Sequence, residues 1–319
     1  MLKFFDNLYA SIKDKNPLYF RLRVYSFERL IVRTMANWLL PIYFKFTSGN
    51  PKFRLAELKD KTGKIIISMT SFPTRINKVW LVIETILRQT IKPDLIILWL
   101  SKDQFPTLDI LPKNLLKLQD RGLRIELVED DLRSHKKYYY TLDQFPNEIM
   151  ITIDDDIFYP AEMVEELMKY YYKFPNSIAA RYCNEIKVEN KDILPYKTWE
   201  SSCMETNPNF KTFFGSGGGV LFPPESLPAE TLNKEVFVNL CLYADDIWLN
   251  TMCRLNKTKV LQIRKDQSSL LPIINRNDIN LHSQNLARNL NDVQLKNVRN
   301  YFISNRGIDP YFEILYPQI

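Results

Sequence analysis

From Lys64 onward, short apolar runs rich in β-branched residues alternate with longer runs of helical periodicity. We expect strands at 65–71, 95–100, 124–130 and 149–154, and a helix at 76–90. Strands that alternate with helices predict a parallel α/β sheet, because parallel neighbours need long crossover connections. In such sheets ligands gather beyond the carboxyl ends of the strands. Functional residues are therefore sought directly after each strand.

The length, the hydrophobic content and the cysteine pattern favour a globular protein with reduced cysteines. The chain has 319 residues and 45% hydrophobic content, enough for a buried core. Its four cysteines show no C-x-x-C pairing, and the N-terminus lacks the apolar core and cleavage site of a signal peptide. We expect a cytoplasmic protein, in preference to a disulfide or zinc protein. The cysteines are Cys183, Cys203, Cys241 and Cys253.

The excess of positive over negative charge lies in the N-terminal segment. Residues 1–60 hold 11 Lys and Arg against five acids, whereas the rest of the chain has 32 of each. This balance, without a basic stripe or stacking motif, argues against nucleic-acid binding.

The same N-terminal segment has the pattern of an amphipathic helix. Apolar residues recur at steps of three and four, with Arg29 and Arg33 on the other side. Arg33, Pro41 and Lys45 interrupt the apolar stretch, which is too short for a transmembrane span. Two interpretations remain equal: a helix in the membrane interface with its basic face towards anionic headgroups, or a helix packed on the main domain. The apolar positions are Phe20, Val24, Phe27, Ile31, Met35, Trp38 and Ile42.

Three acids end the fourth expected strand, in the stretch ITIDDDIFYP. Asp154 and Asp156 should point to the same side, because side chains alternate in extended backbone. Two carboxylates at a strand end suit Mg²⁺ or Mn²⁺, which prefer oxygen ligands and keep positions for water and phosphate. A solvated acidic turn is the alternative.

Three further features follow in order. Residues 215–219 hold four of the chain's eight glycines, which indicates backbone that approaches a ligand closely or makes a tight turn. Asp245 and Asp246 precede a helical run and are either dipole-capping acids or a general base with its neighbour. His282, in LHSQN, is a metal ligand or a structural residue.

Taken in this order, these features resemble the GT-A glycosyltransferases, nucleotide-sugar-dependent enzymes with a single mixed, Rossmann-like α/β sheet flanked by helices. The resemblance covers residues 64–285. It is closest to bacterial family 2-like enzymes that build capsule, lipopolysaccharide or other surface glycans. The usual Glu-Asp pair of the family is Asp245-Asp246 here, which leaves Asp246 as the better base.

The resemblance implies roles for individual residues. Mn²⁺ or Mg²⁺ would be held by Asp154, Asp156 and His282, and would grip the diphosphate of the donor. Donor contacts would come from the strand-end acids and the glycine loop, and the catalytic residues would be Asp246 and Asp245. The donor-contact positions are Asp154, Asp155, Gly217 and Gly218.

Two other stretches supply further donor-binding candidates. Thr70, Ser71 and Arg75 lie in SMTSFPTR after the first strand, where such enzymes commonly seat the nucleotide. In DDLRSHKKYYY, one cation could approach the diphosphate as a point charge. The alternative for that stretch is a solvated basic helix start with core tyrosines behind it. Its cations are His135, Lys136 and Lys137, and we select Lys137.

The sequence thus predicts a basic amphipathic helical segment at 1–60, a GT-A catalytic domain at 61–285 and a C-terminal helical tail at 286–319. The expected activity is metal-dependent, inverting transfer of a sugar from a nucleotide donor, a UDP-sugar, to a hydroxyl of a glycan or lipid-linked acceptor at the cytoplasmic face of a membrane. One rival is a nucleotidyltransferase, although SMTSFPTR lacks the Gly-rich basic signature expected there. The other is a non-catalytic glycan- or membrane-binding protein.

Overall fold

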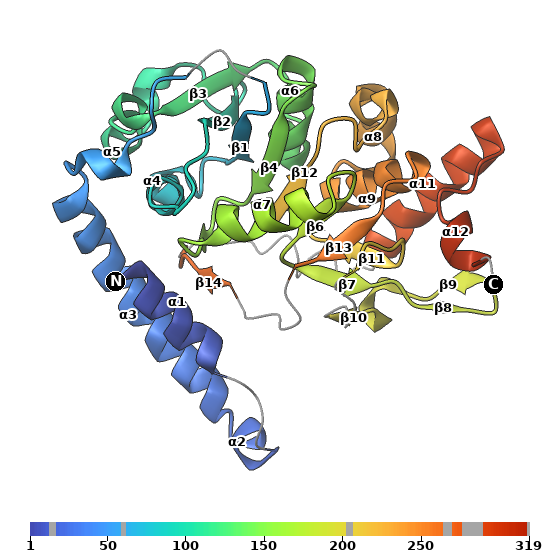
Figure 1. Ribbon diagram of the computed structural model, residues 1–319, viewed down its shortest axis with the longest axis horizontal. Helices are drawn as coiled ribbons and strands as arrows, with labels where there is room; N and C mark the ends of the chain where they lie inside the picture. Colours follow the sequence, from blue (N-terminus) through green and yellow to red (C-terminus); the bar gives the residue numbers. More distant parts are fainter. Residues whose placement is uncertain (13–16, 59–61, 202–206, 264–269, 276–289, 318–319) are drawn as a thin grey trace.

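Burial on both faces of a central sheet organises the fold. The computed structural model describes residues 1–12, 17–58, 62–201, 207–263, 270–275 and 290–317. Seven strands form the main sheet in the order β13-β6-β12-β4-β1-β2-β3 (Figure 1). They are β1 (Ile65–Thr70), β2 (Leu95–Ser101), β3 (Leu123–Val128), β4 (Ile149–Ile153), β6 (Ile178–Ala180), β12 (Gly218–Phe222) and β13 (Val260–Gln262).

The sheet is mixed. β1 pairs in parallel with β2 and β4, and β2 pairs in parallel with β3. β12 enters between β4 and β6 and runs antiparallel to both. The four predicted strands are confirmed as β1 to β4, and the predicted class, α/β with a single mixed sheet flanked by helices, is confirmed as well.

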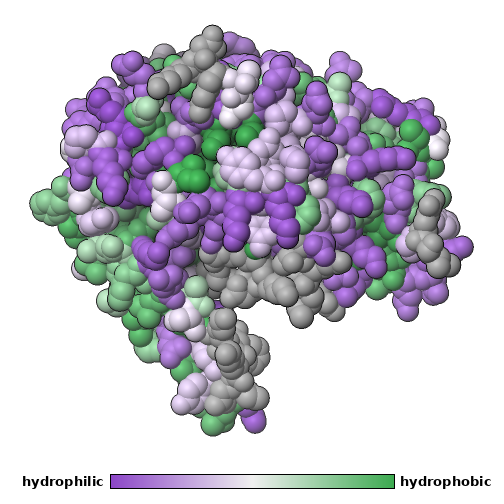
Figure 2. Space-filling model, viewed as in Figure 1, coloured by the Kyte–Doolittle hydropathy of each residue, from purple (hydrophilic) through white to green (hydrophobic). Residues whose placement is uncertain are grey.

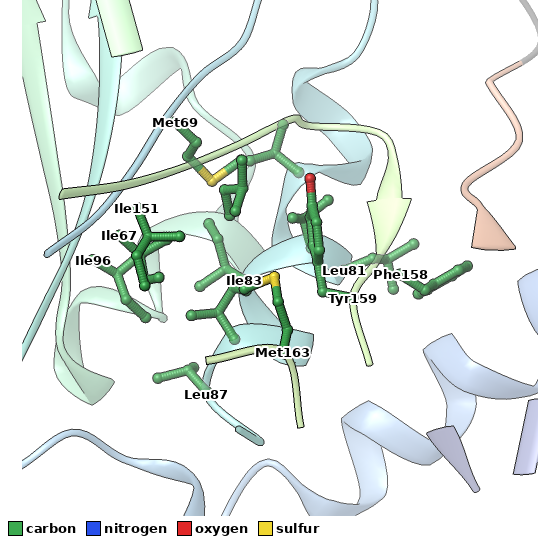
Figure 3. Close-up of a cluster of buried hydrophobic side chains, with 14 of the residues drawn as sticks. Ile67, Met69, Leu81, Ile83, Leu87, Ile96, Ile151, Phe158, Tyr159 and Met163 are labelled. Atoms are coloured by element: carbon green, nitrogen blue, oxygen red, sulfur yellow. The ribbon is translucent and has the colours of Figure 1, made fainter. Parts of the chain in front are cut away.

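Alternate residues of the strands pack on different helices. On one face Ile67, Met69 and Ile151 share a core cluster with α4 (Ile76–Ile86) and α7 (Met163–Lys173), part of which is drawn in Figure 3. On the other face α6 (Lys136–Gln144) lies against β1 and β4. The period of two in the strands therefore divides the core between two helical layers.

The remaining elements flank the sheet. α8 (Lys234–Cys241), α9 (Asp245–Leu255), α11 (Leu290–Arg306) and α12 (Phe312–Leu315) contribute to a second core cluster on the α6 side. α5 is Lys113–Leu116. Small sheets pair β7 (Cys183–Glu185) with β10 (Glu200–Ser201) and β11 (Thr212–Phe214), β5 (Ile157–Phe158) with β14 (Leu271–Pro272), and β8 (Val188–Glu189) with β9 (Asp192–Ile193). The predicted division at 60 and 285 stays a prediction.

The first three helices form a projecting helical arm, residues 1–12 and 17–48 (Figure 1). They are α1 (Leu2–Ser11), α2 (Pro17–Arg21) and α3 (Val24–Thr47), and α3 continues through Pro41. The row of α3 that packs inwards consists of Val32, Ala36, Leu40 and Phe44, which are buried in the main core cluster. In the part of the chain described, no helix is both long enough and apolar enough to cross a membrane.

The predicted apolar stripe is a different row of the same helix. Its members Phe27, Ile31, Met35, Trp38 and Ile42 are exposed. Helix α3 thus packs on the body with one row, as the second interpretation expected, while the predicted row is exposed. The membrane-interface interpretation stays a prediction.

A buried ion-pair cluster and two hydrogen bonds fasten the arm to the body. Glu84, on α4, lies between Arg88 and Arg121 and is 2% exposed. The Arg88 guanidinium donates to Thr47 Oγ1 at 2.8 Å and lies 4.4 Å from the Phe44 ring centroid.

Closer to the middle of α3, Asn37 Nδ2 donates to the carbonyl of Pro272 at 3.0 Å, and its Oδ1 accepts from the Ile274 amide at 2.9 Å. Pro272 and Ile274, late in the sequence, therefore hold a helix from the N-terminal segment.

Replacing Glu84 should destabilise the protein strongly. Glu84→Gln leaves Arg88 and Arg121 buried without a counter-charge, so we expect the free energy of unfolding to fall by about 3 kcal/mol or more in chemical denaturation. The matched control is Glu129→Gln, because the Glu129–Lys102 pair is exposed and should change stability by less than about 0.5 kcal/mol. Equal effects of the two changes would contradict the anchoring role of Glu84.

Candidate active site

Three segments meet at one edge of the sheet. β1 and β4 are parallel neighbours, so the residues after Thr70 and after Ile153 emerge side by side. β12 runs the other way and starts there, with Gly218 opposite Ile153. The sequence-predicted acids, the glycine loop and the SMTSFPTR segment are therefore brought together.

The middle acid of the triplet points into the protein. Asp155 is 5% exposed, accepts a hydrogen bond from the Ser71 hydroxyl, and pairs with the Arg75 guanidinium at 2.8 Å. Burial raises the pKa of the Asp155 carboxyl, and the charge of Arg75 opposes that shift. Arg75 also pairs with Asp156 at 2.9 Å. Ser71 and Arg75 thus hold the acid triplet itself in this structure.

The outer acids are more accessible. The side chains of Asp154 and Asp156 are 44% and 28% exposed. Each faces a different cation, because Asp154 pairs with Lys137 and Asp156 pairs with Arg75.

Lys137 connects the two acidic motifs. It lies in the first turn of α6, is almost fully buried, and its Nζ lies 3.0 Å from Asp154 Oδ1 and 3.1 Å from Asp245 Oδ2. Burial works to lower the pKa of Lys137, but the two carboxylates outweigh it and the pKa is raised. Lys137 therefore remains a cation between the strand-end acids and the acid pair.

The first member of the acid pair is fixed in its ionised form. Asp245 is buried, and its Oδ2 accepts a hydrogen bond from Ser216 Oγ at 2.6 Å as well as pairing with Lys137. Burial raises the pKa of Asp245, but Lys137 together with the hydrogen bond from Ser216 and other neighbouring groups outweighs burial, and the pKa falls to about 2. The carboxylate is thus committed to side-chain partners from two other segments, which simple capping of α9 does not require.

The second member has the opposite environment. Asp246 is partly buried, and its Oδ1 accepts from the Ile247 amide at 2.9 Å. Burial and the neighbouring Asp245 charge raise the pKa of Asp246 to about 7. A carboxylate with that pKa can accept a proton near neutral pH, as a general base must.

The glycine loop lies against the first acid. The Gly217 carbonyl accepts a hydrogen bond from the Asp154 amide at 3.2 Å. A Cβ on Gly217 would fall 1.7 Å from Asp154 Oδ2, a separation that no side chain can adopt. Gly218 lies close to Tyr182, where a Cβ would fall 2.7 Å from the Tyr182 Cβ. The loop is therefore more than a turn between strands, because it needs glycine to seat Asp154.

Two other candidates do not face the acids. His135 is fully buried, stacks on Phe237 at 4.5 Å, and hydrogen-bonds with Tyr138 and the Cys241 carbonyl. Burial lowers the pKa of His135 to about 4. Of the three cations in that stretch, Lys137 is the one that faces the acids. Lys136 is buried and pairs with Asp131.

Thr70 is partly buried, and its hydroxyl donates to the Trp99 carbonyl at 2.8 Å. His282 lies outside the described residues. Its assignment as a metal ligand stays a prediction.

Sequence reasoning missed two residues of the site. Ser216 positions Asp245, and the Tyr159 hydroxyl accepts from the Asp154 amide at 2.8 Å while donating to the Gly217 carbonyl. Ser216 is the one residue other than glycine within 215–219, and Tyr159 follows the acids by three positions. Both residues lie next to the predicted motifs in the sequence, but nearness in sequence does not show which side chain or backbone group each one hydrogen-bonds.

The carboxylates at the end of β4 suit a hard divalent cation. Asp154 and Asp156 present partly exposed carboxylates at a strand end, and Mg²⁺ is usually bound by one or two carboxylates together with water and substrate phosphates. Among the described residues, no group of three or more His, Cys, Asp or Glu side chains is arranged to hold a metal.

Comparison with known proteins gave matches among solved structures. No family model matches the sequence, and no curated protein matches it. The chain is similar to a mannosyltransferase from Pyrobaculum calidifontis solved with GDP-Man and Mn²⁺, at TM-score 0.49 and 11% identity, over 90% of this chain and 79% of that one. It is also similar to residues 1–349 of S. aureus TarS solved with UDP, at TM-score 0.42 and 12% identity.

The TarS match covers 63% of this chain, which spans 58% of the length of that fragment. A further match is 4-diphosphocytidyl-2C-methyl-D-erythritol synthase from Anaerococcus prevotii, at TM-score 0.42 and 14% identity, over 71% of this chain and 98% of that one. The proposals below rest on this chain's own residues.

Adding one methyl group at the glycine loop should disable the acid site. Gly217→Ala forces Asp154 away from its position, so we expect binding of a nucleoside diphosphate with Mn²⁺, measured by calorimetry, to weaken at least about tenfold. Gly49→Ala is the control, because a Cβ there meets nothing within 4 Å. Unchanged nucleotide binding by folded Gly217→Ala protein would contradict a role for Asp154 in that binding.

Proposed function

We propose that the protein is a metal-dependent, inverting glycosyltransferase of the GT-A type. The observation that carries this proposal is Lys137, whose ammonium joins Asp154 of the strand-end triplet to Asp245 of the acid pair. A donor-binding motif and a base-bearing motif, 91 residues apart in the sequence, are thereby neighbours in one site. Sugar transfer requires that arrangement, since the same anomeric carbon must contact the leaving diphosphate and the attacking hydroxyl.

The donor side would be formed by the strand-end acids. Asp154 and Asp156 would hold Mn²⁺ or Mg²⁺, which acts as a Lewis acid towards the phosphate oxygens of the donor. Lys137 adds a fixed positive charge beside Asp154, and Arg75 adds another beside Asp156. Both cations stabilise negative charge that develops on the leaving phosphate oxygen as the glycosidic bond breaks.

The acceptor side would be formed by Asp246. Its carboxylate removes the proton of the acceptor hydroxyl, and the hydroxyl oxygen attacks the anomeric carbon from the face opposite the leaving group. The bond between the anomeric carbon and the phosphate oxygen breaks, and its electron pair passes to that oxygen. A single displacement of this kind inverts the configuration. Asp245 supports it, because its fixed negative charge raises the pKa of Asp246.

The finer parts of the proposal rest on the order of the sequence motifs. They are a UDP-sugar as donor, a hydroxyl of a glycan or lipid-linked molecule as acceptor, and a place in capsule or lipopolysaccharide synthesis at the cytoplasmic face of the membrane. Specificity of this kind depends on a few polar contacts from loops, so it is best measured with a panel of donors.

Nucleotide binding should depend on a divalent metal. UDP with Mn²⁺ should raise the unfolding temperature markedly more than UDP with a chelator, because a ligand at 100 times its Kd stabilises the native state by about 2.7 kcal/mol. Asp156→Ala should abolish the difference, whereas the exposed Asp109→Ala should preserve it. Strong and equal stabilisation with metal and with chelator would contradict the metal assignment.

Transfer should require ionised Asp246. Asp246→Asn preserves shape but cannot accept a proton, so the transfer rate should fall by roughly 10²- to 10⁴-fold while donor affinity barely changes. Because the pKa of Asp246 is raised to about 7, the wild-type rate should fall as the pH drops below 7, where the base becomes protonated. The measurement is kcat against pH for wild type, Asp246→Asn and the exposed control Asp143→Asn.

The same experiments separate the rival functions. Near-normal transfer by Asp246→Asn would exclude Asp246 as the base. Release of pyrophosphate from a nucleoside triphosphate in the presence of a sugar phosphate would identify a nucleotidyltransferase. Tight donor binding with neither transfer nor donor hydrolysis would identify a binding protein.

A further inference from the structure

The helical arm carries a continuous apolar surface that no described element covers. We define the outer face of α3 as the exposed apolar residues of that helix. Trp38 and Phe46 are 77% and 86% exposed, which is extreme for such large side chains. Figure 2 shows hydrophobic residues over the arm where it leaves the body. The outer face comprises Phe27, Leu30, Ile31, Met35, Trp38, Leu39, Ile42 and Phe46.

The exposed apolar residues of the arm are too many to be the scattered single residues found on most protein surfaces. The other two helices of the arm also carry exposed apolar residues, which are Phe4 and Leu8 of α1 and Leu18 of α2. Contiguous apolar patches of this kind mark sites of interaction with a partner or a membrane.

The charges around the outer face are mostly positive. Arg21, Arg23 and Lys45 are exposed on the arm, and the exposed acid on α3 is Glu28. Residues 1–60 as a whole hold 11 basic and five acidic residues. A surface that combines aromatic and aliphatic side chains with basic ones complements anionic headgroups above acyl chains.

We propose that the outer face of α3 docks on an anionic lipid surface, with the helix lying in the plane of the interface. The 24 residues of α3 span about 36 Å, so a long row of side chains can enter the interface together. Docking needs no unfolding, because the inward row that packs on the body shares no residue with the outer face. The docking itself is independent of the activity; its use in reaching a lipid-linked acceptor rests on the proposed function.

A second copy of the chain fits this surface less well. A symmetric contact between two arms would place Arg21, Arg23 and Lys45 of each chain near the same basic residues of the other, and like charges across an interface are repulsive. Anionic lipid removes that repulsion and adds attraction.

The test is vesicle binding by the full-length protein without donor or acceptor. Wild type should cosediment with phosphatidylglycerol-containing vesicles, bind neutral phosphatidylcholine vesicles less, and bind anionic vesicles less in 1 M salt, where the Debye length is about 3 Å. The double variant Trp38→Glu/Phe46→Glu should bind anionic vesicles at least about tenfold more weakly, since two aromatic side chains no longer enter the interface. Thermal unfolding confirms that the variant is folded.

Phe312→Glu is the matched control. Phe312 is 51% exposed on α12, at the other end of the molecule from α3, so this change removes an exposed aromatic outside the arm and should preserve vesicle binding (Figure 1). Equal binding by wild type and the double variant would overturn the proposal. So would a wild-type dimer in light scattering that Trp38→Glu dissociates while vesicles are not bound.

Vesicle binding and catalysis are read separately. UDP binding with Mn²⁺ and transfer to a soluble acceptor should be the same in wild type and in Trp38→Glu/Phe46→Glu. Failure of vesicle binding with intact transfer would refute the docking surface alone, and failure of transfer with intact vesicle binding would refute the proposed function alone.

Discussion

The site depends on one buried ammonium group. Without Lys137, the carboxylates of Asp154 and Asp245 would repel each other at short range, and the buried Asp245 would lose its cationic partner. With Lys137 between them, the end of β4, the start of α6 and the start of α9 are joined by charge-assisted contacts. The different environments of Asp245 and Asp246 follow from this, because the cation stabilises one carboxylate and leaves its neighbour to bear the cost of burial and repulsion.

The strands and the position of the site were predictable from the sequence, and the pairing within the site was not. β1, β2 and β4 are apolar runs that are almost entirely buried, and the edge strand β3 alternates apolar and charged residues, so both kinds of strand could be identified from the sequence. Acids directly after β4 could only emerge at the carboxyl edge of the sheet. His135, Lys136 and Lys137 are adjacent, yet successive helical residues point about 100° apart, so one reaches the acids and another pairs with Asp131. Which one does so depends on how α6 packs on the sheet, and that is tertiary information.

The helical arm is a second case in which the sequence does not show which side of a helix meets the rest of the fold. A helical period identifies rows of apolar residues, but α3 has two such rows, and the period does not say which one meets the core. The inward row includes the small Ala36, whereas the outer face contains the bulky Trp38 and Phe46. The strongest apolar row in the sequence was therefore the one left uncovered, and polarity alone would have assigned it to the core.

The hydrogen bonds of Asn37 have a consequence for how the protein is made. Its partners, Pro272 and Ile274, lie 235 and 237 positions later in the chain. At ordinary rates of translation the ribosome needs on the order of ten to fifty seconds to cover that distance. During this time the arm has been made but lacks the two hydrogen bonds of Asn37, so its packing on the body is still incomplete. Helix α3 therefore reaches its final contacts only after residue 274 has been made.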